Sequence, residues 1–363
     1  MLAPWVSWLV VRNAGEYRGF GGWPADRLLA GANASTTATT VQRIGFFLVP
    51  GFSIADLSSA TEPLLVVNRV RRSQLYSWQL ISDNNQPVAS DSGFILMPHL
   101  SIDQASDFSL IFMVSSLESA GYRNSRVNSW LRRLARTDCR LGAVDCGTIL
   151  LARAGLLDGY RCTLPWQLAQ DFAEEFPEVM VTHELFCIDR NRLTCAGETA
   201  VLDMMLALIA EHQGPNAAIE VAEHLLYTRI RAPGESQRMA VEWRYGITDR
   251  RMVKAITLME QNIAHPLSMQ AIAHTVGVSP RQLERLSAAQ FGCSPSRFYL
   301  ELRLKHAQIL LTQSTDSILG IALRCGFSDA SHLGKCYRKV LHETPAQVRR
   351  GRQAILQELV PCS

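Results

Sequence analysis

Several features that mark common protein classes are missing from this chain. Its 363 residues include nine cysteines, but no CxxC pair and no His and Cys spacing typical of a zinc site. Scattered thiols fit a reducing compartment better than a disulfide scaffold, so we expect a cytoplasmic protein. No stretch approaches the about 18 to 20 apolar residues of a membrane-spanning helix. We therefore expect no membrane partner. We also expect no bound cofactor.

The N-terminus lacks the features of a secretory signal. A signal peptide requires basic residues before its apolar region. Residues 1–11 are apolar, but no basic residue precedes them. Residues 33–40 (NASTTATT) are small and polar, a composition typical of disordered tethers. We therefore predict that residues 1–40 are a disordered extension and that folded structure begins at Val41.

A degenerate repeat is present near the C-terminus. Residues 272–295 are echoed by residues 321–345, and Gly277 of the first copy matches Gly326 of the second. Each copy reads as a short apolar helix, a turn that contains this Gly, and a second helix that opens with a Ser or Asp suited to an N-cap. This order is typical of a helix-turn-helix motif, present here twice.

The second helix of each copy is the one expected to read DNA. In this motif the second helix enters the major groove, and side chains near its N-terminus contact base edges. Residues 295–312, between the copies, predict a helix of roughly 27 Å, which suits two recognition helices in successive grooves about 34 Å apart. The candidate DNA-binding residues are Arg281, Gln282 and Arg285, followed by Ser331, His332, Lys335, Arg338 and Lys339.

The charge distribution agrees with DNA binding. From Asp249 to Arg352, Lys and Arg outnumber Asp and Glu by 15 to 7, although the whole chain carries a net charge of only +3. The basic charge is therefore concentrated on the repeat, where phosphate contacts need it. Charge alone also fits a solvated basic face that binds nothing, or a protein that compacts DNA without sequence preference. The repeated turns favour specific recognition.

The C-terminal segment resembles a known family. The string IALRCGFSDASHLGKCYRKVLHETP, preceded by SPRQLERL and RLKHAQILL, resembles the DNA-binding module of AraC-type regulators over about residues 249–350. Ser287 departs from this pattern because an aromatic residue is usual there, and His342 stands where a Gly is usual. Loss of a buried aromatic side chain would cost on the order of 3 kcal/mol, and His342 must adopt a left-handed conformation that Gly adopts freely.

Between Val41 and about residue 230, short apolar strands alternate with helices. This alternation predicts an α/β fold, with a doubly wound parallel sheet covered on both faces and a ligand beyond the carboxyl ends of its strands. Residues 231–248 would link this sensor domain to an all-α DNA-binding domain at 249–350, and residues 351–363 would form a tail. The expected strands are 44–49, 76–82, 110–114, 141–144 and 185–188, and the expected helices are 54–70, 122–136, 148–154, 166–176 and 199–212.

The most informative motif of the sensor domain is residues 143–148 (AVDCGT), where an apolar strand turns abruptly into a helix. This is the layout of a nucleophile elbow. Together with LLARAGLLDGYRCTLPW, the segment resembles the class I glutamine-amidotransferase-like domain found in one branch of the AraC family. The resemblance places Asp145 at the elbow, Cys146 one residue too late, and Pro165 where active relatives carry a catalytic His.

These departures favour a sensor over an enzyme. Thiolate chemistry needs a Cys beside a base, and the elbow here offers a carboxylate without the expected His. The alternative is a hydrolase or amidase that uses Cys146 and carries the DNA-binding domain as an accessory. That alternative predicts turnover that is lost in Cys146→Ala, whereas a regulator would keep promoter control.

The elbow also suggests the effector. A carboxylate suits a cationic group, and an aromatic face can hold an ammonium. The candidate ligand-binding residues are Asp56, Glu62, Asp145, Cys146 and Trp166, although each could equally be a cap, a core or a solvated side chain. The stretch SSATEPLLVVNRV resembles the branch that senses arginine, carnitine, glycine betaine and similar amines, which implies a cationic amine or amino-acid derivative. The resemblance further implies a nucleoid-associated activator that binds promoter DNA as a homodimer, with RNA polymerase as another partner.

Overall fold

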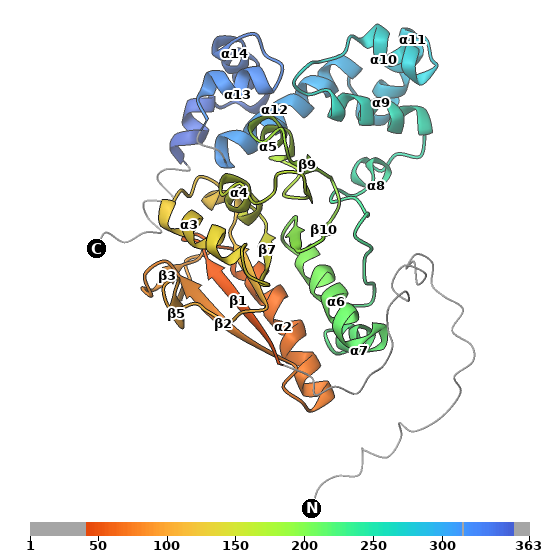
Figure 1. Cartoon of the computed structure of the whole chain (residues 1–363). Helices are drawn as coiled ribbons and strands as arrows, with labels where there is room; N and C mark the ends of the chain where they lie inside the picture. Colours follow the sequence, from red (N-terminus) through yellow and green to blue (C-terminus); the bar gives the residue numbers. More distant parts are fainter. Residues whose placement is uncertain (1–40, 314–315, 352–363) are drawn as a thin grey trace, which may run out of the picture. The chain divides into compact units, whose positions relative to one another are not determined.

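The computed structural model describes residues 41–313 and 316–351. The predicted extension at residues 1–40 and nearly all of the predicted tail lie outside the described residues. The described chain has an α/β part followed by a purely helical part (Figure 1).

The α/β part is organised around one seven-stranded sheet in the order β10-β11-β7-β6-β1-β2-β5. All neighbouring pairs in this sheet are parallel except the edge pair of β10 and β11. The predicted parallel α/β sheet is therefore confirmed. Its strands are β1 (Gln42–Leu48), β2 (Tyr76–Ser82), β5 (Leu100–Ser101), β6 (Leu110–Val114), β7 (Arg140–Val144), β10 (Phe186–Asp189) and β11 (Arg192–Cys195). Two small pairs join β3 (Val88–Ala89) to β4 (Ile95–Leu96) and β8 (Arg161–Cys162) to β9 (Met180–Val181).

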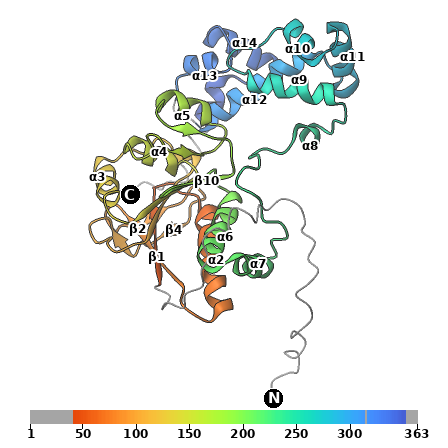
Figure 2. The ribbon, with the colours of Figure 1, turned by 45° about the vertical axis from the view of Figure 1, so that its right-hand side comes forward.

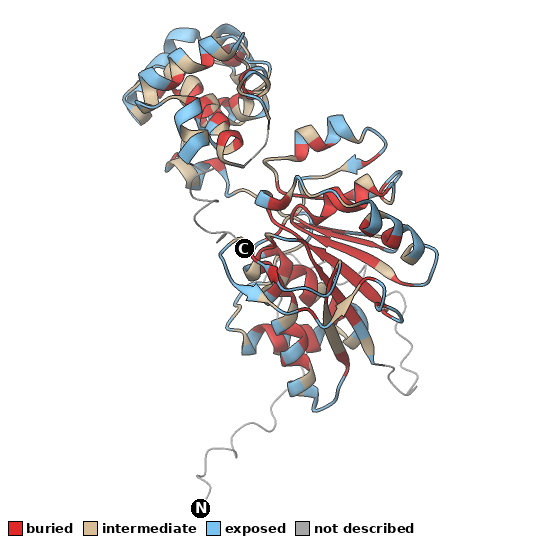
Figure 3. Ribbon diagram, turned by 90° about the vertical axis from the view of Figure 1, so that its left-hand side faces the viewer, coloured by how far each residue is buried: buried red, intermediate tan, exposed pale blue. Residues whose placement is uncertain are grey.

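Helices cover both faces of this sheet, which explains its continuous apolar strands. In β1, the neighbours Phe46 and Phe47 point to opposite faces, yet both are fully buried. Phe46 belongs to the core with α2 (Ile54–Arg71), α6 (Ala200–Gln213) and α7 (Pro215–His224), which lie together in Figure 2. Phe47 belongs to the core with α3 (Ser125–Leu134), α4 (Gly147–Arg153) and α5 (Ala169–Glu175). Figure 3 shows the strands buried along nearly their whole length.

The helical part contains two helix-turn-helix motifs, as predicted. The first pairs α10 (Met269–Val276) with α11 (Pro280–Phe291), and the second pairs α13 (Ile318–Arg324) with α14 (Ala330–Leu341). A single helix, α12 (Pro295–Gln313), joins them. Each recognition helix opens with a side-chain cap, because Ser279 accepts from the backbone of Gln282 and Asp329 accepts from the backbone of His332.

Each motif has its own small core, and the segment before residue 249 contributes to the first. Val241 and Ile247 are buried together with Met252 and Ile256 of α9 (Arg250–Gln261). Val241 opens a short helix, α8 (Val241–Tyr245). The domain boundaries at residues 230 and 249 stay a prediction, but the second half of the predicted linker packs as part of the helical core.

Ser287 fills a site of its own in this core. It is fully buried, and its hydroxyl donates a 2.9 Å hydrogen bond to the carbonyl of Cys293. One turn along α11, Phe291 stacks on Phe298 with ring centroids 4.2 Å apart, and Tyr245 meets both rings edge-on. These three rings supply aromatic packing to this core, while the Ser287 hydroxyl forms a hydrogen bond with the backbone.

His342 at the end of α14 adopts φ 61, in the left-handed region expected for the usual Gly.

Restoring an aromatic residue at this site should therefore destabilise the protein. Ser287→Phe adds a ring to a filled site, with an expected loss of about 1 to 3 kcal/mol. Ser287→Ala leaves the carbonyl of Cys293 without its donor and should cost about 1 kcal/mol. Urea unfolding of the full chain measures both changes. A more stable Phe variant would show that the site holds unused space.

Candidate functional site

The turn between β7 and α4 holds a strained acidic residue. Asp145 has φ 56, in the left-handed region that is costly for any residue except Gly. Cys146, with φ −71, already belongs to the start of α4. A Cβ at Gly147 would lie 2.2 Å from the carbonyl oxygen of Met113, so only Gly lets α4 approach β6 this closely. The elbow position in this protein is therefore occupied by a carboxylate.

A second carboxylate lies at the same place. Asp56, in the first turn of α2, accepts a 2.6 Å hydrogen bond from the backbone N–H of Glu198. A Cβ at the adjacent Gly197 would lie 3.1 Å from the carboxylate of Asp145. Both acids thus contact the same loop before α6. One oxygen of each, Oδ2 of Asp56 and Oδ1 of Asp145, is buried without a hydrogen-bond partner among the described residues.

Burial strongly favours the protonated form of this carboxylate pair. It raises the pKa of Asp56 to about 8, and repulsion from Asp145 adds to the effect. Burial likewise raises the pKa of Asp145 to about 7, although hydrogen bonds from Cys146 oppose it. A cation beside these two acids would relieve the cost of burying their charge.

The neighbouring thiol is poorly suited to nucleophilic chemistry. Cys146 is completely buried. Burial and the nearby Asp145 raise the pKa of Cys146 well above its ordinary value. Near neutral pH the side chain is therefore a thiol and not the reactive thiolate. Pro165, at the position where active relatives carry a His, is buried and has no basic group to offer.

The structure brings Asp56, Asp145 and Cys146 together but places the other two predicted ligand residues elsewhere. Glu62 is exposed on α2, because six residues along a helix lead to a different face from that of Asp56. Trp166 lines a separate cavity of about 1060 Å³ whose lining includes neither Asp56 nor Asp145. The Arg238 guanidinium lies 4.2 Å from the centroid of the Trp166 ring and already occupies the predicted cation-binding face.

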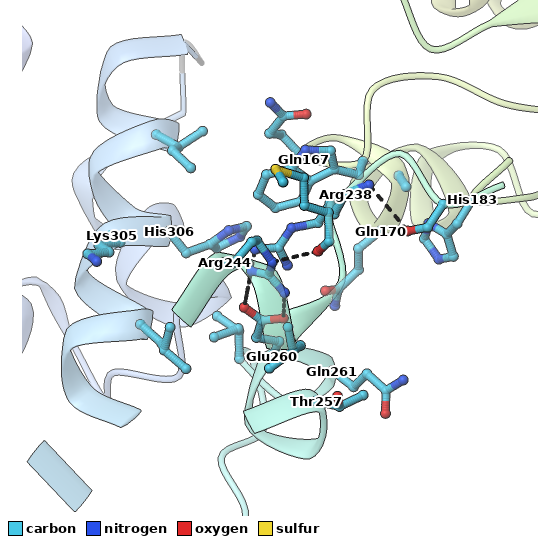
Figure 4. A pocket seen from close by; sticks show the side chains of 18 of the residues that line it. Gln167, Gln170, His183, Arg238, Arg244, Thr257, Glu260, Gln261, Lys305 and His306 are labelled. Carbon is cyan, nitrogen blue, oxygen red and sulfur yellow. Dashed lines mark hydrogen bonds and ion pairs between the residues drawn. The ribbon is translucent and has the colours of Figure 1, made fainter. Parts of the chain in front are cut away.

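This cavity contains a cluster of ion pairs around Glu260 (Figure 4). Both carboxylate oxygens of Glu260, on α9, accept 2.6 Å hydrogen bonds from Arg244, and one also accepts from Arg238 at 3.2 Å. Gln237, the residue before Arg238, accepts a hydrogen bond from the backbone N–H of Trp166 and donates one to the side chain of Thr163. Gln237 is thus bonded to the segment of Thr163 and Trp166, whereas Arg238 is bonded to Glu260 of α9.

All eight predicted DNA-binding residues are exposed on the recognition helices. On α11, the side-chain oxygen of Gln282 accepts a 2.9 Å hydrogen bond from Ser279, so this amide closes the helix cap and is only partly free to read a base. On α14, the ring of His332 lies 3.1 Å from the hydroxyl of Ser328 and packs edge-on against Phe327. These contacts hold the His332 ring at the start of the helix.

Sequence reasoning missed several residues that shape these sites. Gly197 and Glu198 contact the carboxylate pair only through a backbone turn, which leaves no pattern in the sequence. Glu260 is one of seven acidic residues between Asp249 and Arg352, and its position in the sequence does not set it apart from the others. Across the described ranges, no helix is long and apolar enough to cross a membrane, and no cluster of three metal-ligating side chains occurs.

Comparisons with known proteins agree with both halves of the structure. The profile of the DJ-1/PfpI family matches residues 43–211, and that of a helix-turn-helix domain matches residues 272–351. The chain is 40% identical over 308 residues to the HTH-type transcriptional regulator CdhR of Pseudomonas aeruginosa, covering 85% of this chain and 91% of that protein. It is 37% identical over 311 residues to the regulator GbdR of the same species, covering 86% and 85%. It is also 35% identical over 318 residues to the regulator GlxA of Rhizobium meliloti, covering 87% and 98%. With its two helix-turn-helix motifs and its elbow-bearing parallel sheet, the chain belongs to the AraC-type transcriptional regulators that carry an N-terminal DJ-1/PfpI domain.

Proposed function

We propose that this DNA-binding regulator senses a small cationic amine or amino-acid derivative at the carboxylate pair Asp56 and Asp145, and that it does so without catalysis. The observation that carries the proposal is the pair of buried carboxylate oxygens that have no hydrogen-bond partner in the described part of the chain. Buried acidic groups in proteins are normally paired, so an ammonium group offers the missing partner. The resemblance to the amine-sensing branch supports the same chemical class.

An effector at this pair has a contiguous route to the DNA-binding domain. Asp145 lies next to Cys146, the N-cap of α4, and Thr148 of that helix donates a 3.0 Å hydrogen bond to the carbonyl of Thr163. The hydroxyl of Thr163 accepts from Gln237, whose neighbour Arg238 binds Glu260 of α9. Binding regulates only if it favours one arrangement of these contacts over another. This route is the proposed coupling element.

The regulator is further proposed to act at the nucleoid as a homodimer on repeated promoter sites, where it activates transcription through RNA polymerase. The resemblance to the AraC family supports these features. The competing proposal of an amidase that uses Cys146 has little chemical support, because the thiol is buried and protonated. An amidase would lose turnover in Cys146→Ala, whereas the regulator would keep its operator affinity.

Substitutions on the recognition helices test sequence-specific DNA binding. An operator is first selected from a random-sequence DNA pool with the purified protein. Arg281→Ala should then weaken operator binding by about 5- to 150-fold and relax the preference at one base position. Lys339→Ala, at the end of α14, should weaken binding to operator and to scrambled DNA about equally. It should also reduce the slope of log affinity against log salt by about one, which corresponds to the loss of one phosphate contact.

Equilibrium binding at several salt concentrations distinguishes the two effects. Uniform weakening by Arg281→Ala would show that Arg281 contacts phosphate and reads no base. Failure to select any preferred sequence would contradict specific recognition itself. The effector proposal is tested separately, because this assay contains no effector.

A further inference from the structure

The two helix-turn-helix motifs touch each other at a tightly packed turn. Gly326, in the turn of the second motif, has φ +73, and a Cβ there would lie 2.6 Å from the ring of Pro266 and 2.7 Å from the carbonyl oxygen of Ile263. Pro266 and Ile263 belong to the loop that precedes α10 of the first motif. Backbone of the second motif therefore packs directly onto the loop of the first.

The equivalent position in the first motif has a different environment. Gly277 occupies the matching turn with φ +82, but no atom of the described residues beyond its own chain neighbours lies within 4 Å of the place where its Cβ would be. Both glycines satisfy the same backbone requirement of a helix-turn-helix, because both turns are left-handed. Only Gly326 also satisfies a packing requirement between the motifs. The repeat is thus asymmetric at this point.

Two side chains of α12 form hydrogen bonds to the backbone at this contact between the two motifs. Tyr299 donates a 2.6 Å hydrogen bond to the carbonyl of Asn262, next to the loop of the first motif. One turn later, Arg303 donates to the carbonyl oxygens of Cys325 at 2.8 Å and of Gly326 at 2.5 Å. Its guanidinium also lies 4.2 Å from the centroid of the Phe327 ring. A single helix face therefore holds both loops.

We propose that this junction, formed by Tyr299, Arg303 and Gly326 with the loop 262–266, fixes the distance and angle between the recognition helices α11 and α14. The three residues are positioning residues, because they act on DNA only through the geometry of the two helices. In the part of the joining segment that the structure describes before residue 314, α12 is one continuous helix from Pro295 to Gln313. The DNA-binding domain then accepts a single spacing between its two groove-contact segments.

The proposal has a direct consequence for the operator. One inserted base pair moves the second contact segment by about 3.4 Å along the DNA and rotates it by about 34°. A domain with a fixed junction cannot follow this change, so it must give up one set of contacts or deform the DNA. A domain with independent motifs would follow it at little loss of affinity.

The test compares Gly326→Ala with the matched control Gly277→Ala. Both variants place Ala in a left-handed turn, but only the first drives a methyl group into the opposite motif. Binding is measured to the selected operator and to versions with one base pair inserted or deleted between the two footprints. Wild type and Gly277→Ala should prefer the native spacing by at least about tenfold, and Gly326→Ala should lose most of that preference.

Arg303→Gln serves as a second variant where Gly326→Ala fails to fold. It shortens the side chain that donates to the carbonyls of Cys325 and Gly326 and introduces no clash. Arg303→Gln should also reduce the spacing preference, while its affinity for each isolated half-site should equal that of the wild type. Circular dichroism and melting curves identify unfolded variants. Equal spacing preference in Gly326→Ala, Arg303→Gln and the Gly277→Ala control would overturn the proposal, as would a wild type that tolerates the altered spacings. The assay contains no effector, so its outcome is independent of the amine proposal.

Discussion

Asp145→Asn is expected to raise the melting temperature of the sensor domain by about 5 to 10 °C more at pH 8 than at pH 5. The cause is the cost of holding a buried charge. Burial raises the pKa of Asp145 to about 7 in the folded protein, from an ordinary value of 3.8. A carboxyl group with a raised folded-state pKa contributes stability that is complete below about pH 4 and is lost as the pH rises through 7.

The size of this effect follows from the pH window. Each pH unit between the two pKa values removes about 1.4 kcal/mol, so about 3 kcal/mol is lost between pH 5 and pH 7. The Asn variant carries no charge and escapes this loss. Asp138→Asn, at an exposed site, is the matched control and should leave the pH dependence unchanged. A pH dependence as steep in Asp145→Asn as in the wild type would show that this carboxyl group is not the origin of the loss; a shallower remainder is expected from Asp56, because burial raises its pKa as well.

The same variant decides the effector proposal. A cation that binds the carboxylate pair should stabilise the wild-type protein, because it binds only the folded state. Stabilisation should grow from pH 6 to pH 8 as the pair loses its protons. A thermal-shift screen would use arginine, carnitine, glycine betaine, dimethylglycine and choline, with uncharged amino acids for comparison. Equal shifts in wild type and Asp145→Asn would remove the pair from the effector site.

Glu260→Ala is expected to have the second large effect, a loss of about 3 to 5 kcal/mol from the stability of the DNA-binding domain. Glu260 is only 12% exposed and is bound by Arg244 and Arg238. Burial opposes its charge, but the hydrogen bonds and charges of these two arginines outweigh burial and lower the pKa of Glu260. Removing the carboxylate leaves two neighbouring guanidinium groups without their shared partner.

This variant also tests the proposed coupling route. The response of operator affinity to an effector should fall in Glu260→Ala and in Gln237→Ala, because both lie on the route from Thr163 to α9. Glu242→Ala, an exposed acid on α8, is the control and should keep both stability and response. Urea unfolding and operator titrations with and without effector give the two readouts. Unchanged stability in Glu260→Ala would show that these ion pairs contribute no more than solvated surface pairs.

Much of the fold was predictable because the central strands are buried on both faces. The expected strands 76–82 and 110–114 coincide with β2 and β6, and 44–49 and 141–144 overlap β1 and β7 within two residues at either end. Strand β11 escaped prediction because it begins with Arg192. That side chain is buried only because the carbonyl of Leu156 accepts its Nε and the Tyr160 ring lies 5.0 Å away.

The candidate sites also contain some features that are local in the sequence and others that join distant segments. Recognition helices, their caps and the elbow at Asp145 are local features, since each depends on residues within about one or two helical turns, so the order of residues along the chain specifies them. The partnership of Asp56 with Asp145, the placement of Arg238 on Trp166 and the difference between Gly277 and Gly326 join segments far apart in the chain. Such contacts arise only when the sheet and helices pack, because packing determines which faces meet. The sequence therefore specifies a DNA-binding regulator with a carboxylate elbow, and the folded chain specifies which side chains surround that carboxylate and how the two motifs are held.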